Sequence, residues 1–160
     1  MASPSRKANN AAEARVEFPL AESSGFLVRD ANRAFQRLLE RRISPHGVTR
    51  GQWYFLRVLW EEDGLSQREL SARVGMMEPT TVIALRGMEK AGLIRRVRGV
   101  DDKRVTRVHL TPKARRLRDR LLQISQGVND QGAEGIDSAA LAQFRRVIAR
   151  MTENLDRIER

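Results

Sequence analysis

Apolar residues recur along this chain at spacings that predict helices over most of its length and strands only in a short central segment. Over 24–43 they return every three or four positions, which predicts an amphipathic helix that stops at the breaker SPHG, 44–47. Thr49 opens a second, more apolar helix that closes at 61–64. Both tryptophans lie in this helix, and packing in the core is the simplest explanation for Trp60.

Two shorter helices joined by a glycine turn are predicted next. Ser66 and Glu69 form a capping-box sequence, in which the serine hydroxyl accepts from the amide of residue 69 and the glutamate returns to the amide of residue 66. Gly75 allows the tight reversal between the helices. Pro79 is tolerated in the first turn of the second helix, because the amide it lacks has no acceptor within the helix. Gly92 is expected to end that helix.

The segments 93–98 and 104–110 alternate apolar and polar residues, which is the period of strands. The charged loop 99–103 separates them, so the sequence predicts a β-hairpin with a charged tip. A helix–turn–helix followed by such a hairpin is typical of a winged helix-turn-helix, a module that places one helix in the major groove of DNA.

Two long amphipathic helices complete the chain. The first begins at Thr111-Pro112, a polar segment with three glycines at 126–135 predicts a break, and Asp137 or Ser138 caps the last helix. Both helices carry apolar residues in alternating steps of three and four, as coiled coils do. One such seam can pack on its own domain. Three helices outside the winged module carry more apolar surface than that module can cover, which favours a homodimer.

Charge points to a polyanionic partner. The 160 residues include 30 Lys and Arg against 20 Asp and Glu, giving a formal net charge of +10 and a pI of about 11.3. Between Arg86 and Arg120 there are 13 basic and four acidic residues, so nearly all the surplus lies on or beside the winged module. Double-stranded DNA is therefore the expected partner.

Several classes of protein are disfavoured by what the sequence lacks. Without cysteine there is no thiol chemistry or disulfide, and His46 and His109 have no second ligand at metal spacing, so no metal or cofactor is expected. No acid–base or nucleophilic constellation is found, which argues against an enzyme. Neither a membrane span nor a signal peptide is recognisable, so we expect a cytoplasmic, nucleoid-associated protein.

The expected fold class is mainly α with a small β-hairpin wing (α+β), a winged helix-turn-helix with N- and C-terminal dimerisation helices. Residues 1–17 form a flexible tail or an arm on the partner subunit, and 18–48 form the first dimerisation helix and its linker. The DNA-binding domain spans 49–111, and 112–160 hold the C-terminal dimerisation helices. Two alternatives stay open, a sequence-indifferent architectural DNA-binding protein and a winged helix that binds proteins.

The order of these elements, with ELSARVG, PTTV, MEKAGL, DDKR and VHLT in register, resembles the MarR family of bacterial regulators. The resemblance covers roughly 24–158 and is sharpest over 70–111. It implies a homodimer that binds a pseudo-palindromic operator, usually as a repressor. It also implies release from DNA when a small molecule binds, often a phenolic or aromatic acid or its thioester.

The second helix of the helix-turn-helix is expected to read DNA. If Thr81, Leu85 and Met88, with Ala84, face the core, the opposite side faces the groove. There an arginine can fork onto guanine and an apolar side chain can touch a thymine methyl. Plain solvation or core packing is the alternative for each of these side chains. The residues expected on the groove side are Pro79, Thr80, Val82, Ile83, Arg86 and Lys90.

Further DNA contacts are expected from the preceding helix and from the wing. Ser66, Gln67 and Arg68 lie at a helix N-terminus that favours a phosphate, although Ser66 also serves as the cap. Arg96 adds sequence-independent attraction. By resemblance, Asp102 and Arg104 form a pair that stiffens the hairpin, with Arg104 also at the DNA, and Lys103 stands where relatives place a minor-groove arginine. Relatives also commonly carry arginine where Ile83 stands, so their base preference does not transfer.

An effector site is expected between the first helices and the helix-turn-helix. Arg29 and Arg33 are one helical turn apart and can hold a carboxylate or the phosphates of a thioester. His46 and Trp53 can bond to and stack on an aromatic ring. Structural roles for all four are the alternative.

Overall fold

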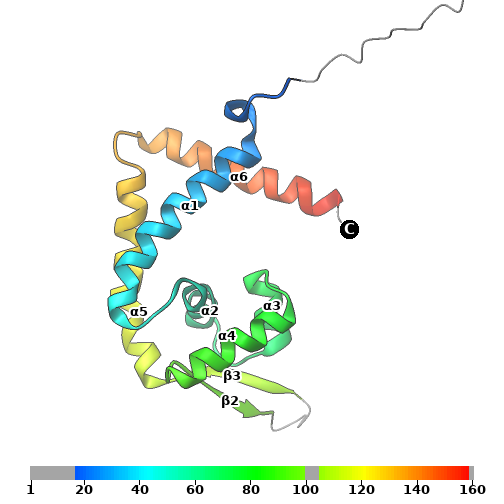
Figure 1. Cartoon of the computed structure of the whole chain (residues 1–160), viewed down its shortest axis with the longest axis vertical. Helices are drawn as coiled ribbons and strands as arrows, with labels where there is room; N and C mark the ends of the chain where they lie inside the picture. The colour runs from blue at the N-terminus through cyan, green and yellow to red at the C-terminus, as the bar shows by residue number, and fades with distance from the viewer. Residues whose placement is uncertain (1–16, 100–104, 159–160) are drawn as a thin grey trace, which may run out of the picture. The chain divides into compact units, whose positions relative to one another are not determined.

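The computed structural model describes residues 17–99 and 105–158, which form helices and one small sheet (Figure 1). The chain divides into two units, residues 1–33 and 34–160, so the boundary falls inside the first long helix. The fold class, mainly α with a small β-hairpin wing, is the one expected from the sequence. In chain order the elements are η1 (Leu20–Glu22), α1 (Ser24–Ile43), η2 (Ser44–His46), α2 (Arg50–Glu61), β1 (Leu65–Ser66), α3 (Gln67–Val74), α4 (Glu78–Lys90), β2 (Ile94–Arg98), β3 (Thr106–Leu110), α5 (Pro112–Gly132) and α6 (Ser138–Ile158).

Local capping sequences set where the helices begin. The Thr49 hydroxyl accepts from the Gln52 amide at 3.3 Å, and the Gln52 side chain accepts from the Thr49 amide at 3.0 Å, which forms a complete capping box at the start of α2. A carboxylate oxygen of Asp137 accepts from the Ala140 amide at 2.9 Å and caps α6. These helix starts confirm the predictions. Both partners of each capping bond lie within three residues of one another, so the sequence alone reveals them.

The sheet has three antiparallel strands in the order β1-β3-β2. Leu65 pairs with Val108 across β1 and β3, and Ile94 pairs with Leu110 across β2 and β3. Strand β1 was not predicted, because its two residues are too few to show an alternating pattern. The first strand of the wing begins one residue later than predicted, at Ile94, because Leu93 still belongs to the turn after α4.

The core of the winged module joins α2, α3, α4 and the sheet. Phe55, Leu70, Leu85 and Val108, one from each of these elements, have no exposed surface. Trp60 packs against this core as expected, and its indole Nε1 also donates to the Ala114 carbonyl at 3.1 Å. The hydrogen bond ties the start of α5 to the winged module.

Helix α5 ends inside the segment 126–135, where the sequence predicted a break. The helix continues through Gly127, buries Val128 and ends at Gly132. A Cβ on Gly132 would lie 2.5 Å from the ring of Phe35. This glycine, at the end of α5, therefore also allows a ring from the second half of α1 to pack on the helix backbone.

Candidate nucleic-acid interface

Ser66 and Glu69 close the N-terminus of α3 with a capping box. The Ser66 hydroxyl accepts from the Glu69 amide at 3.2 Å, and a Glu69 carboxylate oxygen accepts from the Ser66 amide at 2.8 Å. The hydrogen bond from the Ser66 amide, followed by that of its side chain, holds the pKa of Glu69 below its ordinary value. The predicted cap is confirmed, and in the first turn of α3 that follows it Gln67 is half-buried and Arg68 is exposed.

A buried pair of hydroxyls fixes α3 against α4. The Thr81 hydroxyl donates to the Ser71 hydroxyl at 3.0 Å, and the Ser71 hydroxyl donates to the Met76 carbonyl. Gly75, with φ of 69°, makes the turn between the two helices. Sequence reasoning assigned Thr81 to the core but missed Ser71, whose only signal was a polar residue next to the buried Leu70.

One side of helix α4 is buried in the core, and the opposite side, which carries both polar and apolar residues, faces solvent. Thr81, Leu85 and Met88 are fully buried, and Ala84 packs partly against the core, so the predicted core side is confirmed. On the opposite side Ile83 is 72% exposed, although it is aliphatic. Val82, expected at the groove, is half-buried between the two sides. The other predicted groove residues, Pro79, Thr80, Arg86 and Lys90, are exposed as well.

An ion pair joins the end of α4 to the wing. Nε and a terminal nitrogen of Arg96 donate to the same carboxylate oxygen of Glu89, at 3.0 and 2.6 Å. The hydrogen bonds from the Arg96 side chain lower the pKa of Glu89. Arg96, predicted to contact DNA, therefore already has an anionic partner within the chain.

The predicted wing-tip residues Asp102, Lys103 and Arg104 lie outside the described residues. Among the described residues of the hairpin, Arg107 donates to the Gly64 carbonyl at 3.0 Å. This bond anchors β3 to the segment that leads into β1.

Asp63 connects β3 with the first turn of α5, a role that sequence reasoning missed. One carboxylate oxygen accepts from the Leu110 amide at 2.8 Å, and the other forms an ion pair with Arg115. Thr111 donates to the Gly92 carbonyl at 2.7 Å, and Lys113 donates to the Ala91 carbonyl at 2.8 Å. The first turn of α5 is thus bonded to the turn after α4 as well as to the turn after α2.

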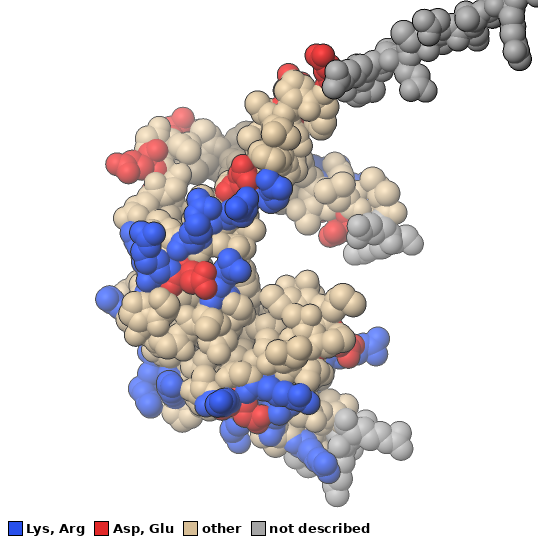
Figure 2. Space-filling view, in the orientation of Figure 1, with Lys and Arg blue, Asp and Glu red and all other residues tan. Residues whose placement is uncertain are grey.

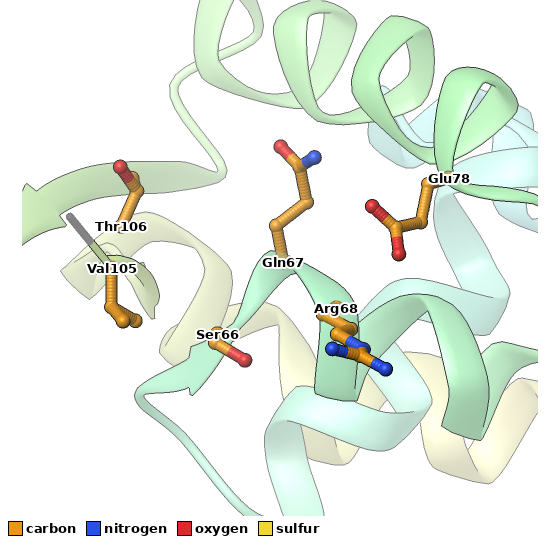
Figure 3. A pocket seen from close by; sticks show the side chains of 6 residues that line it. All are labelled: Ser66, Gln67, Arg68, Glu78, Val105 and Thr106. Atoms are coloured by element: carbon orange, nitrogen blue, oxygen red, sulfur yellow. The ribbon is translucent and has the colours of Figure 1, made fainter.

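A shallow pocket of about 340 Å³ opens where the starts of α3 and α4 meet the start of β3 (Figure 3). The Gln67 side chain extends into it, between Thr106 and Glu78 (Figure 3). Two of the residues predicted to hold a phosphate, Ser66 and Arg68, also line it. The acidic Glu78 beside them was not part of the predicted site, and its only signal was its place in the first turn of α4.

Basic side chains gather over α4 and the hairpin (Figure 2). Arg86 and Lys90 of α4 and Arg95 and Arg98 of β2 are all exposed. Such a concentration of positive charge attracts a polyanion over a distance of several ångströms.

Comparison with known proteins agrees with this geometry. The family model described as the MarR family matches residues 48–106. The structure resembles a MarR transcriptional regulator from Methanosarcina mazei Go1, with 28% identity, a TM-score of 0.78 and coverage of 84% of this chain and 96% of that chain. It also resembles the transcriptional regulator PA3341, with 33% identity, a TM-score of 0.75 and coverage of 84% and 99%. The chain belongs to the MarR family of transcriptional regulators.

A curated relative is longer than the region that matches. The HTH-type transcriptional regulator TtmR of Methylorubrum extorquens (strain PA1) is 35% identical over 96 residues, which are 60% of this chain and 49% of TtmR. The match therefore spans about half the length of that relative.

The fold is also that of the repressor CouR. CouR bound to a 23-mer DNA duplex is 23% identical with a TM-score of 0.77, covering 86% of this chain and 99% of that chain. CouR from Rhodococcus jostii RHA1 bound to p-coumaroyl-CoA is 22% identical with a TM-score of 0.73, covering 84% and 95%. At these identities the likeness concerns the fold alone.

The four residues predicted to bind an effector in this MarR-family protein differ in their exposure and in their contacts. In the first unit, Arg29 lies over the ring of Phe26 at 4.4 Å and pairs with Asp30, and Arg33 is exposed and 3.9 Å from the same carboxylate. In the second unit, His46 is half-buried at the end of η2. Trp53 is 4% exposed and packs edge-on against Trp60, with ring centroids 5.9 Å apart.

The C-terminal helix exposes its apolar face. Phe144, Leu155 and Ile158 of α6 are 58%, 62% and 82% exposed. Next to the start of α6 lies an apolar cavity of about 460 Å³ lined by Phe35, Ile136 and Phe144, among others. Of the predicted seam, Leu141, Ile148 and Met151 are half-buried, whereas Phe144, Leu155 and Ile158 remain exposed.

Two structural absences concern only residues 17–99 and 105–158. In these segments no group of three or more His, Asp or Glu side chains is arranged to hold a metal ion. No helix there has the length and apolarity to cross a membrane.

Proposed function

We propose that this MarR-family protein binds double-stranded DNA as a homodimer and represses transcription from a pseudo-palindromic operator. The observation that carries the proposal is the two-sided character of α4. Leu85 and Met88 hold one side in the core, while Thr80, Ile83 and Arg86 stand exposed on the other. A helix anchored in this way can enter the major groove without losing its packing.

Each exposed side chain suits a particular contact. Arg86 can donate two hydrogen bonds to guanine, Thr80 can reach a phosphate or a base, and Ile83 can contact a thymine methyl. Gln67 and Arg68, in the first turn of α3, are suited to phosphates. Lys103 in the wing is suited to the DNA backbone, because an ammonium lacks the planar fork of arginine.

The exposed face of α6 supports a homodimer. Phe144, Leu155 and Ile158 would cost free energy if they stayed in water, and a two-fold axis can bury the same face from both subunits at once. A symmetric dimer carries two copies of α4, which fits an operator with two half-sites.

We further propose that a small molecule weakens DNA binding. The candidate class is an aromatic acid or its CoA thioester, held by Arg29, Arg33, His46 and Trp53. The p-coumaroyl-CoA bound to CouR supports the ligand class, and the positive charge of the two arginines suits a carboxylate or a phosphate. The small molecule must bind two arrangements of the dimer with different affinities in order to change the affinity of the protein for DNA.

The decisive experiment is a footprint of the full-length protein on the DNA upstream of its own gene. We expect protection of one pseudo-palindrome, with affinity at least about tenfold higher than for random DNA of equal length. Equal affinity for both would support the architectural alternative instead. Arg86→Ala should lose the protection, whereas Arg118→Ala, in α5, should keep it.

The effector is tested on the same fragment. Aromatic acids and their CoA thioesters are added one at a time, and at least one is expected to weaken the footprint. If all of them leave it unchanged, the aromatic effector is abandoned while the DNA-binding proposal stands.

A further inference from the structure

Gly87 occupies an unusual place in the α4 helix. It lies in the third turn of a 13-residue helix, where glycine destabilises the helical backbone relative to alanine. The residue is exposed, and a Cβ built on it would meet no described atom within 4 Å apart from its chain neighbours and the local helix backbone. The fold itself would therefore accept, and gain stability from, an alanine at this position.

Other glycines of the chain have a reason that Gly87 lacks. Gly75 and Gly92 adopt positive φ at helix ends, where a side chain would be strained. Gly132 allows the Phe35 ring to approach the backbone. Gly87 has neither a positive φ nor a close neighbour, and Gly25 and Gly51 share this lack of constraint. Gly87 differs from those two because it lies on the exposed side of α4, the side that the proposed function turns toward DNA.

The surroundings of Gly87 indicate what would enter that space. Ile83 lies one turn earlier on the same face and is 72% exposed, and Lys90 lies three residues later. We call the exposed surface made by the bare backbone at Gly87 and by Ile83, one turn earlier, the Ile83–Gly87 notch. Ile83 is the aliphatic part of this surface, and Arg86 precedes Gly87 in the chain.

We propose that the Ile83–Gly87 notch receives the C5-methyl group of a thymine in the major groove. The inference rests on the proposed function, since it takes α4 as the helix that enters the groove. Among the four bases only thymine presents an apolar group on its major-groove edge. An aliphatic wall beside a bare backbone matches that group in size and polarity.

The notch would allow α4 to recognise a DNA base without a charged side chain. Thymine is selected by burial of its methyl group and by close approach of the helix backbone. Arg86, on the adjacent position, remains free to donate to a neighbouring base. The consequence is a preference for thymine at one base pair of each half-site.

The test begins with a duplex that the wild-type protein enriches from a random-sequence library. Gly87→Ala is compared with Gly51→Ala, a matched control in α2, where a Cβ would also meet nothing within 4 Å. Both variants should raise Tm by a few degrees, which shows that each is folded. Gly87→Ala should weaken binding to the duplex about tenfold, because a methyl added to a filled contact overpacks it. Gly51→Ala should change the dissociation constant by less than about twofold.

The second arm replaces each thymine of the enriched duplex by uracil, which removes only the methyl. At one position per half-site the wild-type protein should bind about fourfold more weakly, the value for one buried methyl group. Gly87→Ala should lose less than about twofold at that same position, because its own methyl already fills the notch.

The outcomes separate the two proposals. If the wild-type protein enriches no sequence, sequence-specific DNA binding fails, and the notch fails with it. If it enriches a duplex and Gly87→Ala binds that duplex as the wild type does, only the notch is wrong. It is also wrong if the enriched half-site holds no thymine, or if no thymine-to-uracil change distinguishes the two proteins.

Discussion

Replacing Arg96 by Gln tests whether this side chain braces the wing or contacts DNA. Two nitrogens of Arg96 donate to one carboxylate oxygen of Glu89, at 3.0 and 2.6 Å, and thereby connect β2 to the last turn of α4. The two side chains are 30% and 39% exposed, so solvent screens their attraction. We therefore expect Arg96→Gln to lower the free energy of unfolding by about 0.2–1 kcal/mol.

The salt dependence of DNA binding gives the sharper measurement. Each phosphate contact contributes about −0.9 to the slope of log K against log salt concentration, so a dimer that loses two contacts changes its slope by about 1.8. Because Glu89 already balances the charge of Arg96, Arg96→Gln should leave the slope unchanged. Lys90→Gln, which removes an exposed charge from the same end of α4, should reduce its magnitude by about 1.8.

The assay is fluorescence anisotropy of a labelled operator duplex at a series of KCl concentrations. Glu89→Gln should change the salt slope in the opposite direction. It removes the partner of Arg96, so the arginine can bind a phosphate and the slope should become steeper. The bracing role is refuted if Arg96→Gln flattens the slope as much as Lys90→Gln does. In that case the ion pair opens on DNA and Arg96 binds a phosphate.

Three further predictions concern stability, pH and assembly. Because the pKa of Glu69 is lowered in the folded state, the ionised carboxylate stabilises the fold above the ordinary pKa of 4.5, and this contribution is lost as pH falls through the lower folded pKa. The Tm of the wild type should therefore exceed that of Glu69→Gln at pH 6 and equal it in strong acid. A difference in Tm that persists in strong acid would contradict this. Leu85→Ala should cost about 2–5 kcal/mol in urea unfolding, because it empties a fully buried site; a loss below 1 kcal/mol would mean that the site collapses. Phe144→Glu with Leu155→Glu should convert the dimer to a monomer in sedimentation experiments, and an unchanged dimer would place the interface elsewhere.

The sequence predicted those parts of the fold that are ordered by neighbouring residues. Thr49 and Ser66 begin their helices because each hydroxyl meets an amide three residues later, so a short window of sequence contains both partners. The buried side of α4 was predicted for the same reason, since Thr81, Leu85 and Met88 follow the helical period.

Features that depend on distant contacts were missed. The packing role of Gly132 depends on Phe35, about a hundred positions away, whose ring lies against the glycine backbone. Strand β1 exists because Leu65 pairs with Val108, and two residues carry no period of their own. The roles of Ser71 and Asp63 likewise follow from their partners across the fold, since both residue types are also common in helices and turns without such bonds.

The bonds around the start of α5 determine how movement passes through this molecule. Asp63 pairs with Arg115, Trp60 donates to Ala114, and Lys113 donates to Ala91, so three successive residues of one helical turn are held by three different segments. A hinge at this point would have to break all of these bonds at once. We therefore expect the first turn of α5 to move together with the wing and α4 as one body.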